Sequence, residues 1–285
     1  MPACHAGGRE FESRPFRKKP RFIGAFFVLS PSQSIPSHVL SQLSLIHAII
    51  LFGAAFILGL SKSGIKGISI IIVAMLVFVF GAKPSTGILL PMLIVGDIFA
   101  VIYYHRHAQW KYLIRLLPFM VIGVLLGTWA GDSLTEEAFR KGMAAVILLA
   151  VIVMFLWDKR KSKSVPQHIG FAGIMGLTAG FTTMVGNLAG SFANIFFLAM
   201  RLPKDAFIGT TAWLFLIINL FKVPFHIWSW ETINLETIQV SVVTIPAIFL
   251  GLFVGIRILK KVNDALFRKF TLLMTAIGAI IIYLT

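Results

Sequence analysis

The stretch "GLSKSGIKGI", residues 59–68, interrupts a long apolar run with three glycines and two lysines. A similar break, "GFTTMVGNLAGS" at residues 180–191, separates two later apolar runs. Glycine destabilises a helix, and in lipid every freed backbone group needs a partner in protein or in a water-filled cavity. Two breaks of this kind in corresponding halves of a chain indicate the central site of a transporter.

The composition is that of an integral membrane protein. Of the 285 residues, 58% are hydrophobic and 13% are charged, whereas soluble domains carry roughly 25% charged residues. The net charge of +15 does not indicate nucleic-acid binding, because the basic residues lie mostly between apolar runs, where membrane orientation accounts for them. Cys4 is the only cysteine, which excludes an internal disulfide and a thiolate metal site. We expect no cofactor and no metal.

The expected fold is all-α and polytopic, with about ten apolar segments after residue 42. They cover residues 43–60, 66–82, 85–104, 112–131, 139–157, 168–186, 189–200, 206–227, 237–256 and 264–284. The segment at 189–200 is too short to cross a bilayer unaided. Whether the first two segments of each half cross the membrane or form re-entrant hairpins stays open.

The segments fall into two five-segment halves. Landmarks of the first half recur 128 residues later in the second, and others recur 122 residues later. The pairs at 128 are Pro118 with Pro246 and Gly123 with Gly251, and those at 122 are Gly87 with Gly209 and Asp97 with Asn219. This spacing predicts two transmembrane repeats, 43–157 and 168–285, joined by a basic linker at 158–167. With an odd number of crossings in each, they would be inverted repeats.

Residues 1–42 differ from the rest of the chain. A basic segment, a short apolar run and a Ser/Pro-rich stretch follow one another, which is the order found in a signal peptide. A disordered extension, or a start codon placed too early, explains the same pattern. The other basic loops alternate with base-poor ones, so we expect both termini to be periplasmic and the linker at 158–167 to be cytoplasmic.

Two polar residues inside apolar segments are candidates for the transport mechanism. Asp97 lies deep in the third segment, where a carboxylate is costly and usually faces a cavity or a partner. We expect it to couple transport to protons, the alternative being a structural contact. Lys222 lies three residues after Asn219, on the same helix face. We expect these two to bind substrate, Lys222 either holding an anion or pairing with Asp97. The alternative for Lys222 is a lysine that reaches to the interface.

Candidate substrate-binding residues also surround the two breaks. Helix starts present free N–H donors and a positive dipole end, which suit an anion. We expect contacts from both breaks and from the start of the segment at 206–227, although bases in a cytoplasmic loop and a helix cap explain some of these residues equally well. The set is Lys62, Gly64, Lys66 and Gly67 at the first break, Gly186, Asn187 and Gly190 at the second, and Thr210.

Five strings together resemble one family. They are "GLSKSGIKG" (59–67), "STGILLPMLIVGDIFAVIYYHRHAQWKYL" (85–113), "GFTTMVGNLAG" (180–190), "MRLPKDAFIGTTAWLFLIINLFKVPFHI" (200–227) and "LGLFVGIRILKK" (250–261). The family is TauE/SafE, the sulfite exporter family of bacterial permeases, and the resemblance covers roughly residues 43–284. It implies a secondary transporter, and an exporter, of sulfite, sulfoacetate or related organosulfur and carboxylate anions in the cell inner membrane.

The expected partners are thus a small anionic substrate and the lipid bilayer, and a homo-oligomer stays open. An anion channel is the nearest alternative. A membrane-embedded enzyme is more distant, because the segments lack an acidic pair, a His cluster or a nucleophile–base arrangement.

The charge pattern generates a prediction about topology. A reporter fused after Thr285 should be active only when it is of the kind that works in the periplasm. Labelling of the Lys159–Lys163 loop by a membrane-impermeant reagent added to intact cells would contradict both this orientation and the inverted repeat.

Overall fold

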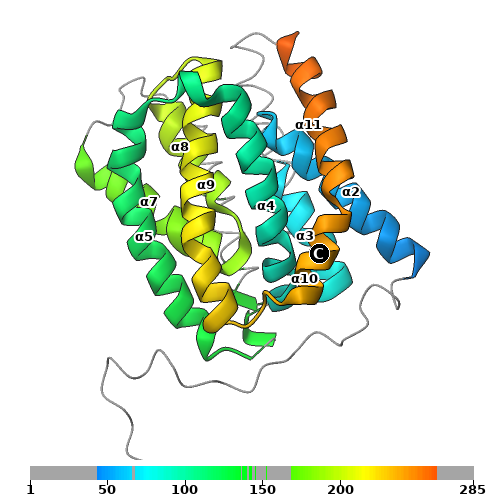
Figure 1. The fold of residues 1–285 in the computed structure, drawn as a ribbon. Coiled ribbons are helices and arrows are strands. Elements are labelled where there is room, and N and C mark those ends of the chain that lie inside the picture. The colour runs from blue at the N-terminus through cyan, green and yellow to red at the C-terminus, as the bar shows by residue number, and fades with distance from the viewer. Residues whose placement is uncertain are drawn as a thin grey trace, which may run out of the picture. The chain divides into compact units, whose positions relative to one another are not determined.

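The apolar runs form helices throughout the part of the chain that the structure describes (Figure 1). This computed structural model describes residues 44–65, 68–135 and 168–261, with isolated positions between 137 and 152. In chain order the elements are α2 (Leu45–Lys62), α3 (Ser69–Phe80), α4 (Ala82–Tyr104), the short 3-10 helix η2 (His105–His107), α5 (Trp110–Asp132), α7 (Ile169–Gly186), α8 (Ala189–Ala199), α9 (Lys204–Trp228), α10 (Leu235–Val243) and α11 (Ile245–Lys260). The N-terminal segment 1–42, the linker 158–167 and the segment at 264–284 lie outside the described residues, as does most of the segment at 139–157.

Five of these helices are long and apolar enough to cross a membrane, namely α2, α4, α5, α7 and α9. The predicted segment at 66–82 is shorter than expected, because α3 has only 12 residues, and α8 has 11. A helix needs about 20 residues to span the hydrocarbon core, so neither can cross it. The predicted segment at 237–256 is a bent pair, α10 and α11, with an angle of 43° between them. Pro246 at the start of α11 explains the break, since proline begins a helix but cannot continue one.

Two pairs of helices approach each other closely through glycine. Gly251 of α11 lies against the Phe56 carbonyl oxygen of α2, and a Cβ at this position would overlap that oxygen. Gly180 of α7 lies in the same way against the Met120 carbonyl oxygen of α5. In lipid, helices associate through such close backbone packing at small residues. The α2–α11 and α5–α7 contacts are therefore built alike.

Helices α4 and α9 run antiparallel through the middle of the described residues. Gly87 near the start of α4 packs against Thr232, just beyond the end of α9. Gly209 near the start of α9 packs against Tyr104 at the end of α4. The middles of both helices therefore face each other, flanked by the ends of α2 and α7.

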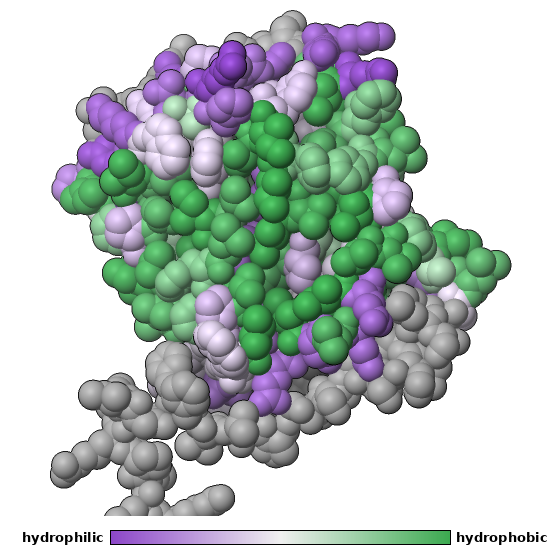
Figure 2. Space-filling view, in the orientation of Figure 1, coloured by the Kyte–Doolittle hydropathy of each residue, from purple (hydrophilic) through white to green (hydrophobic). Residues whose placement is uncertain are grey.

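Several basic segments share one end of the helices. Lys204 at the start of α9 donates from Nζ to the Leu259 carbonyl oxygen of α11 at 3.4 Å, and Gln109 donates from its backbone N–H to Thr210 Oγ1 at 2.8 Å. Figure 2 shows hydrophilic side chains gathered at the upper end of this view and an apolar belt below them. The belt is the surface that a bilayer would cover.

The glycine contacts predict a graded effect on stability. Gly180→Ala should lower the free energy of unfolding by roughly 1–3 kcal/mol, because the new methyl group forces α5 and α7 apart. Gly142→Ala is the matched control, since a Cβ at Gly142 would meet no described atom within 4 Å. Thermal unfolding of the purified protein in detergent measures both. Equal melting temperatures for the two variants would contradict the assignment of Gly180 to a close helix contact.

Candidate functional site

The two helix breaks have the backbone geometry that ends a helix inside a protein. The chain leaves α2 through Gly64 with φ of 123°, a conformation that favours glycine. It leaves α7 through Asn187 in the left-handed conformation, with φ of 56° and ψ of 32°. The Asn187 N–H donates to the Thr183 carbonyl oxygen, and the Leu188 N–H donates to that of Thr182. Asparagine tolerates this conformation better than most residues. Each break is thus a fixed turn.

The end of α2 before the first turn, and Asn187 at the second turn, border one small cavity. Its volume is about 40 Å³, which holds a few water molecules at roughly 10–15 Å³ each. The lining comes from the end of α2, the start of α3, the middle of α4, the second break with the start of α8, and the middle of α9. These residues are Leu58, Ser61, Lys62, Ser69, Ile72, Leu89, Leu93, Thr183, Asn187, Ala189, Gly190, Asn194, Phe215 and Asn219.

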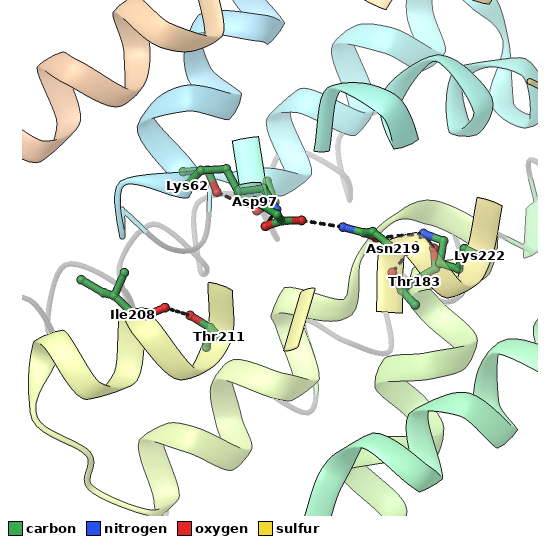
Figure 3. A network of polar contacts seen from close by, with 9 residues as sticks. Lys62, Asp97, Thr183, Ile208, Thr211, Asn219 and Lys222 are labelled. Atoms are coloured by element: carbon green, nitrogen blue, oxygen red, sulfur yellow. Dashed lines mark hydrogen bonds and ion pairs between the residues drawn. The ribbon is translucent and has the colours of Figure 1, made fainter. Parts of the chain in front are cut away.

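Beside this cavity, a buried ion pair joins α2 to α4 and a hydrogen bond joins α9 to α4 (Figure 3). Lys62 Nζ donates to Asp97 Oδ1 at 2.6 Å, and Asn219 Nδ2 donates to Asp97 Oδ2 at 2.8 Å. Asp97 is fully buried, and Lys62 is 8% exposed. A carboxylate in a low-dielectric interior is stable only with such partners. The contact between Asp97 and Asn219 joins the two positions that the 122-residue spacing relates.

Lys222 lies behind the cavity wall and holds three of its residues in place. Its Nζ donates to the Thr183 carbonyl oxygen at 2.8 Å, to Thr183 Oγ1 at 3.2 Å, to Asn219 Oδ1 at 3.4 Å and to Asn187 Oδ1. All of these acceptors are neutral. Lys222 is fully buried, so the alternative that it reaches to the interface is wrong. The hydrogen-bonded ion pair of Asp97 is made by Lys62, and Asn219 links the carboxylate to Lys222.

The starts of α3 and α8 both meet the cavity, at Ser69 and Ala189. Neither helix has a side-chain cap hydrogen bond at its N-terminus. The first N–H groups of a helix have no partners within the helix and carry the positive end of its dipole. Two such ends at one cavity favour an anion there.

Asn194 of α8 is a polar lining residue that the sequence reasoning missed, as are Ser61, Ser69 and Thr183. It is 3% exposed, and its Oδ1 has no hydrogen-bond partner in the part of the chain described here. A buried acceptor without a partner is costly, so this oxygen indicates a hydrogen-bond donor, such as water, in the cavity. An amide within an apolar segment was the available signal, because polar residues at that depth are usually functional.

Three other sequence-predicted residues, Gly64, Gly186 and Thr210, lie apart from the cavity lining. Gly64 packs against Ile208 of α9 and Leu259 of α11, and Gly186 is the buried last residue of α7. Thr210 Oγ1 donates to the Ala206 carbonyl oxygen at 2.6 Å and accepts from the N–H of Gln109, so it serves the start of α5. Lys66 and Gly67 lie outside the described residues. Lys62, Asp97, Asn187, Gly190, Asn219 and Lys222 are the predicted residues that the structure brings together.

Within the described ranges, no three His, Cys, Asp or Glu side chains are grouped so that they could hold a metal ion. The polar groups at the cavity are ammonium, amide, hydroxyl and backbone N–H donors, with one carboxylate engaged in an ion pair. This donor set suits a small anion.

Broken helices whose ends meet at a buried polar cavity are characteristic of membrane transport proteins. Residues 22–282 match the family described as "Sulfite exporter TauE/SafE". The chain therefore belongs to the TauE/SafE sulfite exporter family, which is a family of transporters and not of enzymes, and the resemblance of the five strings is confirmed. The match begins within the segment 1–42. No curated protein and no solved structure matches the chain.

The cavity geometry predicts a size limit at Gly190. A Cβ there would meet only Asn194 Nδ2, at 3.6 Å, so Gly190→Ala should keep transport. Gly190→Leu should abolish it, because the longer side chain fills a space of about 40 Å³. Sulfite uptake into proteoliposomes measures transport by the two variants. Their expression and detergent extraction show whether each is inserted into the membrane. Normal transport by Gly190→Leu would show that substrate does not use this cavity.

Proposed function

We propose that this protein is a secondary transporter that exports a small oxyanion, such as sulfite, sulfoacetate or a related organosulfur or carboxylate anion, across the cell inner membrane. The observation that carries the proposal is the cavity at which two uncapped helix starts, the Lys62 ammonium and the Asn194 amide meet. Membership of a sulfite exporter family supports a sulfur oxyanion as the substrate.

The charge balance at the cavity supports an anionic ligand. The described network contains two ammonium groups, Lys62 and Lys222, and one carboxylate, Asp97. With all three ionised, one positive charge remains, and two helix dipoles add to it. An uncompensated charge away from water is unfavourable, and either loss of the Lys222 proton or a monovalent anion at the cavity would remove it.

The packing of the helices supports the inverted repeat. The first half would comprise α2, α3, α4 and α5, and the second α7, α8, α9 and the bent pair α10–α11. Under this pairing the α2–α11 contact corresponds to the α7–α5 contact, and glycines closely packed against carbonyl oxygens occur in both. The antiparallel pair α4 and α9 would lie on the axis that relates the halves. Rocking of one half against the other would then expose the cavity to each side in turn.

The short helices support re-entrant hairpins in both halves. Since α3 and α8 are too short to cross, each would return toward the side from which α2 or α7 entered. The backbone at the hairpin tips is tolerated at membrane depth because it lines a polar cavity. The turn after α2 contacts the end of α4 through Ser63 and Tyr104, whereas the turn after α7 contacts the start of α4 through Asn187 and Thr86.

The ion pair supports a coupling mechanism. An anion that binds Lys62 competes with Asp97 for the same ammonium group. Asp97 would then lose its ion pair with Lys62, and taking up a proton would remove the charge that Lys62 no longer balances. Anion and proton would therefore move together, and the concentration difference of the anion itself would drive an outward step.

The variant Asp97→Asn tests two proposals together, that the protein transports sulfite and that transport is coupled to protons. The variant should still exchange labelled sulfite across proteoliposomes, because the amide keeps the size and the hydrogen bond to Asn219. Accumulation of sulfite driven by a pH gradient should fall to the level of protein-free liposomes, because an amide cannot take up the proton. Both assays use the same purified protein.

The control for this experiment is the double variant Lys62→Gln/Asp97→Asn, which removes both charges of the pair, so that neither is left buried without the other. Breaking the buried pair in Asp97→Asn alone would lower the free energy of unfolding by roughly 3–5 kcal/mol. The double variant should regain this stability, whereas proton-coupled accumulation of sulfite should not return. Normal gradient-driven accumulation by Asp97→Asn would remove Asp97 from the mechanism. Flux that does not saturate with sulfite would favour the channel alternative.

A further inference from the structure

Two adjoining grooves lie at the basic end of the helices, far along α4 and α9 from the central cavity. One has a volume of about 390 Å³ and lies among Tyr103, Lys204, Lys260 and their neighbours. The other, about 430 Å³, extends past Arg106 to the start of α5. His107, Lys204 and Asp205 border both. The two grooves form one continuous surface site, which we call the basic groove.

The basic groove carries positive charge. Its cationic side chains are Arg106, Lys204 and Lys260, and its one carboxylate is Asp205, which gives a net charge of +2 with His107 neutral. It also lies at the start of the 25-residue helix α9, where the dipole is positive. Orientation in the membrane requires basic loops at this end, but it does not require them to enclose a groove. The charge therefore suits a bound anionic group.

The surface next to the basic groove is apolar. Ile98 and Ile102 on one face of α4 are 40% and 61% exposed, and Phe249 and Phe253 on one face of α11 are 38% and 55% exposed. The Phe99 and Phe249 rings lie 4.1 Å apart, so these parts of α4 and α11 are neighbours. This apolar strip belongs to the belt that faces the bilayer. A ligand with a charged head and long apolar chains fits both features.

We propose that the basic groove binds the headgroup of an anionic phospholipid, with the acyl chains along the apolar strip of α4 and α11. The Lys204 and Lys260 ammonium groups face the phosphate, and the tyrosine ring of Tyr103 lies at the headgroup level, as aromatic residues at membrane interfaces do. A soluble oxyanion would use the charged groove but would leave the apolar strip without a role.

The site has a structural consequence for the first helix break. Tyr104 borders the groove and donates from its hydroxyl group to the Ser63 carbonyl oxygen at 3.1 Å. Leu259, which also borders it, packs against Gly64. A headgroup in the groove therefore contacts the residues that hold the turn after α2. Bound lipid would stabilise this turn.

The test is a lipid titration of the full-length protein in detergent, read by native mass spectrometry. Phosphatidylglycerol should bind in preference to phosphatidylcholine of the same chain length. Lys204→Gln/Lys260→Gln should weaken phosphatidylglycerol binding roughly 30-fold, which corresponds to about 1 kcal/mol for each lysine near the headgroups. The charge-matched control is Lys111→Gln/Arg115→Gln, which changes two basic residues of α5 outside the groove and should bind as the unaltered protein does.

Three outcomes would overturn the proposal. They are equal affinity for the two lipids, an equal loss in the control variant, and full competition by inorganic phosphate, which would make the groove a site for a soluble anion. Melting temperatures of both double variants in lipid-free detergent show whether either has lost its fold. If the groove variant has, the single variants Lys204→Gln and Lys260→Gln replace it, each with roughly a fivefold expected loss. Sulfite transport is not part of the readout, so the result is independent of the proposed function.

Discussion

The rest of the structure depends on one constraint, which is that the backbone at a buried helix break must find polar partners. The breaks after α2 and α7 leave buried helix ends with this need. The protein meets this need by bringing both ends to one place, where Asn187, Thr183 and Lys222 bind one another and where the starts of α3 and α8 meet a polar cavity. Lys62 at the first break is linked to Lys222 at the second through Asp97 and Asn219. The polar groups that the two breaks need therefore meet at one buried polar cluster.

The buried charges follow from the same arrangement. Lys62 is near the end of α2, within reach of α4 only because α2 stops in the interior. Gly96 makes room for it, since a Cβ there would come within 2.8 Å of the Lys62 side chain. Asp97 is thus held between a cation from one helix break and an amide from the opposite helix, while Lys222 fixes the second break. Each break has its own lysine. Lys62 pairs with the carboxylate of Asp97, whereas Lys222 donates to neutral groups of Thr183, Asn187 and Asn219.

The sequence predicted the helices and their breaks well, because both depend on local properties. Apolar run length fixed α2, α4, α5, α7 and α9 to within a few residues, and the glycine clusters located both turns. The pairing of Lys62 with Asp97 was missed because 35 residues and a turn separate them, and the spacing of residues on one helix made Lys222 the nearer candidate. The short α3 was missed for a different reason. The run at 66–82 is apolar throughout, and nothing in its composition distinguishes a helix that crosses from one that turns back.

The contact between Asp97 and Asn219 gives a physical reason for the difference between the two halves. In the proposed inverted repeat, equivalent residues lie close together only near the axis that relates the halves, and these two side chains are within hydrogen-bonding distance at 2.8 Å. Two aspartates at this distance would repel each other, and one would have to stay protonated. Two asparagines would pair well but could not compensate Lys62. One aspartate and one asparagine satisfy both conditions, because the amide donates to the carboxylate while its oxygen accepts from Lys222. A duplicated chain whose halves meet at such a pair therefore gains from becoming asymmetric there, and the asymmetry leaves a single carboxyl group at the centre, where one proton can be bound and released.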